Sequence, residues 1–333
     1  MPNADAALAQ LADDHIAQDF PHAPGKAPTR RDVTATFGDK LQQRFGGRGA
    51  EVLGHPRFRL HMLTRRGRHL LRREGRVRTP LGYLGAFATN LVSRRAMGGW
   101  LERVLFSDPS EALPFAPHDS RTQRVDLSAA NLQPSLVASC SIPFWLDAVH
   151  DIPGAPRGAY WDGGITDYHL HLDCAQVSDG LVLYPHVQCS VVPGWRDKGL
   201  THRHAATARL ANVVLHVPSA EWIKAALPLR KLPDRGDFKA YGDDLAGRQK
   251  AWRRAVAESQ HLADEFAALV QQPSIEALAL PCAALACVAQ GTAGGDSKAP
   301  VHGDPFDAAH RNSVVPRRPP ANRGPLMLEL NAN

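Results

Sequence analysis

An acidic residue followed by two glycines, directly after two aromatic residues, is the feature that most restricts how this chain folds. Tyr160-Trp161 leads into Asp162-Gly163-Gly164. Aromatic residues favour strands, and consecutive glycines allow the backbone conformations of a tight turn. The sequence therefore predicts that Asp162 is held on a sharp turn at the end of a strand.

A helix that ends at a proline is expected before this turn. Residues 131–143 carry apolar side chains at roughly helical spacing. Pro143 cannot continue a helix, and it biases the residue before it toward extended geometry. Residues 144–160 contain two prolines and two glycines, which indicate a loop between the helix and the strand.

Together these features resemble the second half of the patatin-like phospholipases. The resemblance lies in Ala-Ser-x-x-x-Pro at 138–143 and Asp-Gly-Gly at 162–164, and it extends over residues 1 to about 280. It implies an α/β fold, a three-layer α/β/α sandwich of the patatin type, in which Asp162 is the base of a Ser–Asp dyad. Gly163 and Gly164 would form the turn that carries this base. The implied substrates are phospholipid or acylglycerol esters, with no cofactor.

The family's nucleophile motif, Gly-x-Ser-x-Gly, does not occur in the 333 residues. The nearest match, Gly295-Asp296-Ser297-Lys298-Ala299, lies in a polar tail after Asp162 rather than before it. The expectation is a patatin-like domain whose N-terminal part is missing, and which is inactive alone. Ser139 and Ser141, close to Asp162 in the family arrangement, are expected to be structural hydroxyls.

Glycines at 46, 47 and 49 resemble the family's oxyanion loop in composition. An oxyanion loop needs a strand before it and a helix after it, so that free backbone amides face an anion. Here the glycines follow a helix-like stretch at 36–45 and precede a strand-like one. The pattern favours a helix stop with a turn.

A second class of function, a metal-dependent hydrolase, is suggested by residues 167–173. If this stretch is extended, Asp167, His169, His171 and Asp173 lie on one face. Two histidines with nearby carboxylates can bind zinc or another divalent metal. No further clustered ligand set is evident in the sequence, and alternation of polar residues with leucine is also what any half-exposed strand shows.

A basic segment supplies a third reading, a non-catalytic lipid-surface or protein-binding remnant. Residues 65–78 contain seven arginines, which suit anionic lipid headgroups or simply form a solvated face. No interleaved aromatic residues support nucleic-acid binding. The predicted peripheral contact with anionic membrane would use Arg65, Arg66, Arg68, Arg72, Arg73, Arg76 and Arg78.

Periodicity predicts further elements. Helices are expected over 1–20, 81–105, 220–227 and 243–270, and strands over 57–64, 180–186 and 213–215. The segment 81–105, interrupted at Gly98-Gly99, is amphipathic and could pack on the sheet or form a lipid-facing lid. Core packing is the default expectation for it.

Composition places the chain in a reduced compartment. Five cysteines show no paired spacing, and neither a secretory apolar region nor an apolar run of membrane-spanning length occurs. The predicted location is cytoplasmic, with possible peripheral membrane contact. Residues 1–280 are expected to form the acyl hydrolase domain, and 281–333 a low-complexity, disordered tail.

Overall fold

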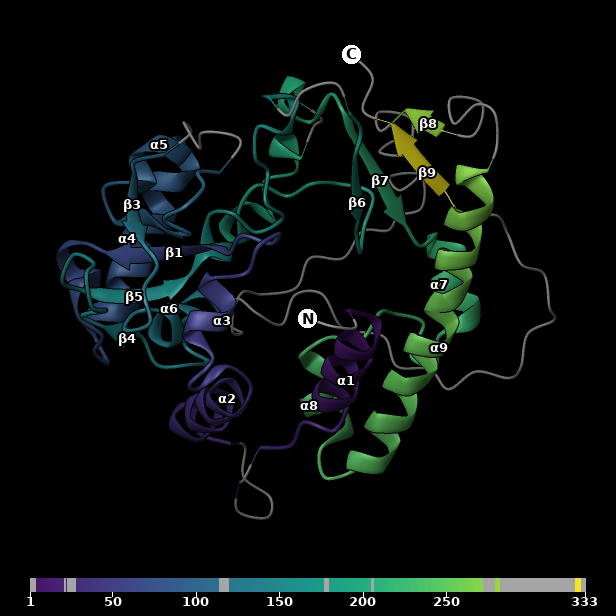
Figure 1. Cartoon of the computed structure of the whole chain (residues 1–333), viewed down its shortest axis with the longest axis horizontal. Coiled ribbons are helices and arrows are strands. Elements are labelled where there is room, and N and C mark those ends of the chain that lie inside the picture. Colours follow the sequence, from purple (N-terminus) through teal and green to yellow (C-terminus); the bar gives the residue numbers. More distant parts are fainter. Residues whose placement is uncertain are drawn as a thin grey trace, which may run out of the picture. The chain divides into compact units, whose positions relative to one another are not determined.

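The computed structural model describes residues 4–20, 22, 28–113, 120–176, 180–204, 207–271, 279–281 and 327–330. The chain divides into two compact units (Figure 1). The larger unit consists of Gln18–Val182 and Ser190–Val213. The smaller unit consists of Met1–Ala17, Leu183–Cys189 and Val214–Ala332.

A five-stranded mixed sheet forms the centre of the larger unit. Its strand order is β3-β2-β1-β5-β4, and only the β2–β3 pair is parallel. The strands are β1 (His61–Gly67), β2 (Leu101–Ser107), β3 (Thr122–Asp126), β4 (Val149–His150) and β5 (Ala159–Asp162). Mixed α/β architecture is therefore confirmed.

Two sequence predictions in this sheet need correction. Residues 101–105 were predicted as helix but belong to β2, in which every residue is buried. A strand covered on both faces has no alternating pattern, so its apolar run is easily mistaken for part of a buried helix. The strand predicted over 57–64 begins only at His61 and continues to Gly67.

Helices lie on both faces of this sheet. One core packs α6 against the sheet through Met62, Phe106, Leu132 and Tyr160, among others. The other packs α4 and α5 through Tyr83, Met97 and Trp161. The α-helices of the unit are α2 (Arg30–Phe45), α3 (Gly49–Leu53), α4 (Arg78–Val92), α5 (Arg94–Met97) and α6 (Leu132–Ser139).

Among the described residues of the larger unit, six short 3-10 helices lie in the loops. They are η1 (His69–Arg72), η2 (Gly163–Ile165), η3 (Cys174–Gln176), η4 (Trp195–Asp197), η5 (Thr201–Arg203) and η6 (Ala208–Leu210). The glycines at 46–49 end α2, as predicted, with Gly47 at a φ of 75°. The next element is α3, however, and not a strand.

The smaller unit contains α1 (Ala4–Ile16), α7 (Ala220–Ala226), α8 (Gly236–Tyr241) and the long α9 (Leu245–Val270). Its sheet has the order β6-β7-β9-β8, with β6 (Val182–Pro185), β7 (Val213–Val217), β8 (Ala279–Pro281) and β9 (Met327–Leu330). Strand β6 alternates between half-buried and exposed residues, and it forms within the stretch 180–186 that was predicted as a strand.

Strand β9 changes the prediction for the C-terminal segment. Residues 281–333 were expected to lack regular structure, yet Met327–Leu330 pairs with both β7 and β8. Most of the predicted tail, including Ser297, lies outside the described residues. Over the residues that the structure describes, no helix has both the length and the apolar character to cross a membrane.

Candidate functional site

Asp162 is the last residue of β5, at the strand end that the sequence predicted. Strand β5 lies between β1 and β4, and Asp162 is paired in register with Thr64 of β1. The preceding aromatic pair is completely buried, with Tyr160 in one core and Trp161 in the other. Consecutive strand residues point to opposite faces, so this pair fixes β5 between the two helical layers.

The turn after Asp162 requires a glycine at position 163. A Cβ on Gly163 would lie 2.5 Å from the carbonyl oxygen of Leu63, too close for any side chain. The Gly164 N–H donates a 2.8 Å hydrogen bond to Oδ1 of Asp162. Backbone and side chain are therefore both held at this strand end, and the carboxyl group has a defined orientation.

The two sequence motifs meet at this turn. The Asp162 N–H donates to the carbonyl oxygen of Ser141 at 3.0 Å, which links the end of α6 to the end of β5. The two serine hydroxyls nearby donate hydrogen bonds to backbone carbonyl oxygens. Ser139 Oγ donates to Leu136 O and Ser141 Oγ donates to Val137 O, both at 2.9 Å. Neither hydroxyl is arranged as a nucleophile, in keeping with the structural role expected for them.

The Asp162 carboxyl is chemically unusual. Burial raises its pKa above the ordinary value of 3.8; the Gly164 N–H opposes this shift, and the negative charge of Asp167 adds to it. Only the bond from Gly164 reaches this carboxyl from the described residues, so Oδ2 has no protein donor among them. A carboxylate with a raised pKa and one available oxygen is suited to accept a proton.

Cys140 lies at the end of α6 and is the nearest thiol that could act as a nucleophile. Desolvation raises its pKa, Ser139 opposes the shift, and the charge of Asp162 adds to it. A thiol must ionise to attack a carbonyl carbon. The environment of Cys140 therefore disfavours the thiolate form that such an attack needs.

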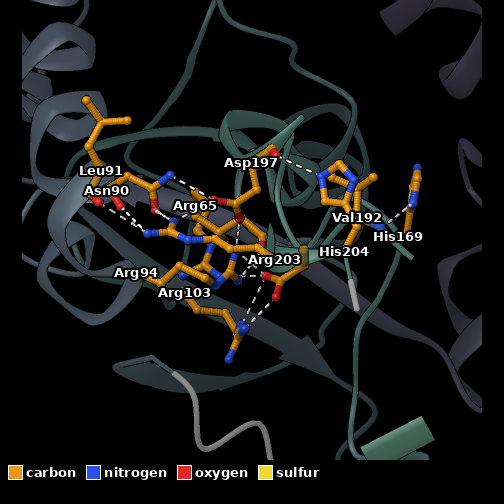
Figure 2. Close-up of polar contacts among 12 residues, drawn as sticks. Arg65, Asn90, Leu91, Arg94, Arg103, His169, Val192, Asp197, Arg203 and His204 are labelled. Atoms are coloured by element: carbon orange, nitrogen blue, oxygen red, sulfur yellow. Dashed lines mark hydrogen bonds and ion pairs between the residues drawn. The ribbon is translucent and has the colours of Figure 1, made fainter. Parts of the chain in front are cut away.

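A buried ion-pair network follows the Asp162 turn, and Figure 2 shows most of its members. Arg65 and Arg103 are register partners on β1 and β2, and both bind the carboxylate of Asp167. Burial alone would raise the pKa of Asp167, but the two arginines outweigh it and lower that pKa to about 2. The carboxylate thus bridges two like charges placed side by side in the sheet and offsets their repulsion.

A second buried carboxylate, Asp197, ties α4 to the loop at 194–204. It accepts from Asn90 and Arg203, each at 2.9 Å, and it pairs with Arg94 (Figure 2). Its own carbonyl oxygen contacts His204 Nε2 at 2.9 Å. Every group in this cluster is engaged by another, so its geometry indicates structural support rather than a binding site.

The membrane contact predicted through all seven arginines needs correction at two of them. Arg65 is 1% exposed and bound to Asp167, so it cannot face a bilayer. Arg66 is paired with the buried Glu102 at 2.6 Å. Tertiary partners that lie far away in the sequence remove both from the basic surface, whereas Arg72 and Arg76 are exposed.

The strand proposed to carry metal ligands does not form. Residues 166–173 are irregular, and Leu170 has a φ of 47°, which breaks extended geometry. His169 Nδ1 accepts from Val192 N at 2.9 Å, and His171 Nε2 contacts Thr207 Oγ1 at 3.0 Å. In the part of the chain that the structure describes, no group of three or more metal-ligating side chains occurs.

Tyr83, which the sequence did not single out, lies beside this site. Its ring contacts Trp161 and Phe144, each at 5.6 Å between centroids, and the Arg196 guanidinium lies 5.3 Å above it. Burial raises its pKa well above 10.0, and Asp162 is among the charges that act on it. Its hydroxyl is buried and has no hydrogen-bond partner among the described residues.

Tyr83→Phe is expected to stabilise the protein by about 1 kcal/mol, because it removes a buried hydroxyl that makes no hydrogen bond. Tyr160→Phe is the matched control, since the equally buried Tyr160 hydroxyl donates to Pro156 O. That control should lose about 1 kcal/mol. Urea unfolding measures both changes, and a loss of stability in Tyr83→Phe would contradict the unpaired hydroxyl.

Comparison with known proteins gives no relative for this chain: no family model, no curated protein and no solved structure matches it.

Proposed function

We propose that this chain supplies the general base, Asp162, of a Ser–Asp acyl hydrolase site that acts on phospholipid or acylglycerol esters. The observation that carries the proposal is the state of the Asp162 carboxyl. It is half-buried on a turn where only glycine fits at position 163, its pKa is raised, and one of its oxygens has no protein donor among the described residues.

The chemistry follows from this carboxylate. A serine hydroxyl is a weak nucleophile until a neighbouring base takes its proton. Asp162 would accept that proton through Oδ2 as the serine oxygen attacks the ester carbonyl, and would return it to the leaving alcohol. Backbone donors must stabilise the oxyanion that forms, at about 3–4 kcal/mol for each donor.

The resemblance to patatin-like phospholipases supports this reading at the level of architecture. A mixed sheet with helices on both faces is compatible with a three-layer α/β/α sandwich of that type. Since Gly-x-Ser-x-Gly is missing from these 333 residues, we place the serine and the oxyanion donors in polypeptide that is not part of this sequence.

The first test measures hydrolysis of a short-chain aryl ester and a phospholipid by the purified chain. No turnover above background is expected, because loss of an activated nucleophile costs a serine hydrolase on the order of a millionfold in rate. A polypeptide extended through the coding sequence upstream, and carrying Gly-x-Ser-x-Gly, should be active. Robust turnover by the chain alone would show that a serine within it is the nucleophile, and replacing Ser139, Ser141 and Ser297 in turn would identify it.

A further inference from the structure

Helix α4 has one buried face and one exposed apolar face. The buried residues recur every three or four positions and fill the core beside the sheet: Thr79, Gly82, Tyr83, Ala86 and Asn90. Leu81, Leu84 and Leu91 recur on the other side and are 52%, 62% and 50% exposed. We call these three leucines, together with the exposed Val77 and Val92 at the helix ends, the α4 stripe.

Packing on the buried face fixes the rotation of α4 about its own axis. A Cβ on Gly82 would lie 2.6 Å from the Leu71 side chain, and one on Gly85 would lie 2.5 Å from Trp100. Asn90 Nδ2 donates to Asp197 at 2.9 Å near the end of the helix. The helix therefore cannot turn to bury the α4 stripe, and the core packing predicted for Leu84 and Leu91 is wrong.

The charged residues in the segment that carries the α4 stripe are all basic. Residues 75–101 contain four arginines and no acidic residue. Arg76 is exposed before the stripe and Arg95 after it, and Arg72 is exposed on η1. Glu74, the nearest preceding acid, is paired with Arg30 at 2.7 Å. An apolar stripe bordered by arginines matches a surface that is apolar inside and anionic at its boundary.

We propose that α4 lies in the interface of an anionic membrane, with the α4 stripe among the acyl chains and Arg72, Arg76 and Arg95 against lipid phosphates. Contiguous exposed apolar side chains favour a partner that removes them from water. In this arrangement the buried Arg65 and the paired Arg66 do not contact the membrane, and the apolar α4 stripe inserts into it. It does not depend on Asp162, so vesicle binding and ester hydrolysis can fail independently.

The test is co-sedimentation of the full chain with vesicles of phosphatidylcholine alone or mixed with phosphatidylserine, at low and high salt. Leu84→Asp should weaken binding to the mixed vesicles about tenfold or more. The variant puts a charged side chain where an apolar one would move from water into the acyl chains. Leu8→Asp is the matched control, because Leu8 is 64% exposed on α1. Arg72→Ser combined with Arg76→Ser should reduce the salt dependence.

Strong binding to mixed vesicles that Leu84→Asp removes and Leu8→Asp retains supports the proposal. Binding to neither vesicle, or equal binding by wild type and Leu84→Asp, overturns it. A dimer in solution that Leu84→Asp converts to monomer, without vesicle binding, would also overturn it by making the stripe a subunit interface. Because Leu84 is exposed, its variant should unfold at the wild-type urea concentration, which excludes misfolding as the cause.

Discussion

Asp162→Asn is expected to lower ester hydrolysis by the proposed extended polypeptide by about a millionfold, with little change in KM. Asparagine keeps the shape of the side chain and can still accept from the Gly164 N–H, but it cannot take the serine proton. Loss of the residue that takes the serine proton has an effect of about this size in serine hydrolases. The measurement is kcat on an aryl ester.

Asp126→Asn is the matched control for this variant, because Asp126 also ends a strand but its side chain is 69% exposed. It should leave kcat unchanged. Equal activity of Asp162→Asn and wild type would show that Asp162 is only a turn residue.

The pH dependence of kcat/KM and of stability also reports on the Asp162 carboxyl. Because the pKa of Asp162 is raised above 3.8, kcat/KM should rise with pH through that raised value. The folded state binds this proton more tightly than the unfolded state does. Stability contributed by the neutral carboxyl therefore falls as pH rises from the unfolded to the folded pKa.

The effect of the Asp162 charge on stability distinguishes a catalytic carboxylate from a structural one. At neutral pH the charged, shielded carboxylate costs stability, so Asp162→Asn should unfold at a higher urea concentration than wild type while it loses activity. A variant that loses both stability and activity would instead indicate a structural carboxylate.

Asp167→Asn is expected to destabilise the larger unit by about 3–5 kcal/mol, because it removes the carboxylate that pairs with two buried arginines. Arg65 and Arg103 are each 1% exposed, so water cannot compensate them. Asp126→Asn again provides the control, since its ion pair with Arg124 is exposed and should be worth less than about 1 kcal/mol. Urea unfolding at neutral pH measures both.

The stability that Asp167 contributes changes with pH in the opposite direction to that of Asp162. Its folded pKa is about 2, below the ordinary 3.8. The stability that it contributes is therefore fully present above pH 3.8 and is lost as pH falls through about 2. Wild type and Asp167→Asn should converge in stability over that range, and a constant difference at all pH values would contradict the ion-pair explanation.

Local signals in the sequence predicted the candidate base and several elements. Two aromatic residues before Asp-Gly-Gly were enough to place Asp162 at a strand end. The regular apolar spacing over 243–270 predicted α9, which the structure has at Leu245–Val270. These features depend on backbone preferences and on periodicity within one segment, so one sequence carries them.

The features that only the tertiary structure decided depend on residues that are distant in the sequence. Arg65 is buried because Asp167, 102 residues later, neutralises it. Leu101–Ser107 is a strand because β1 and β3 pair with it on either side. Leu84 is exposed because glycines on the opposite side of α4 pack closely against Leu71 and Trp100. Burial, strand pairing and charge neutralisation are properties of three-dimensional neighbours, and those neighbours appear only once the chain has folded.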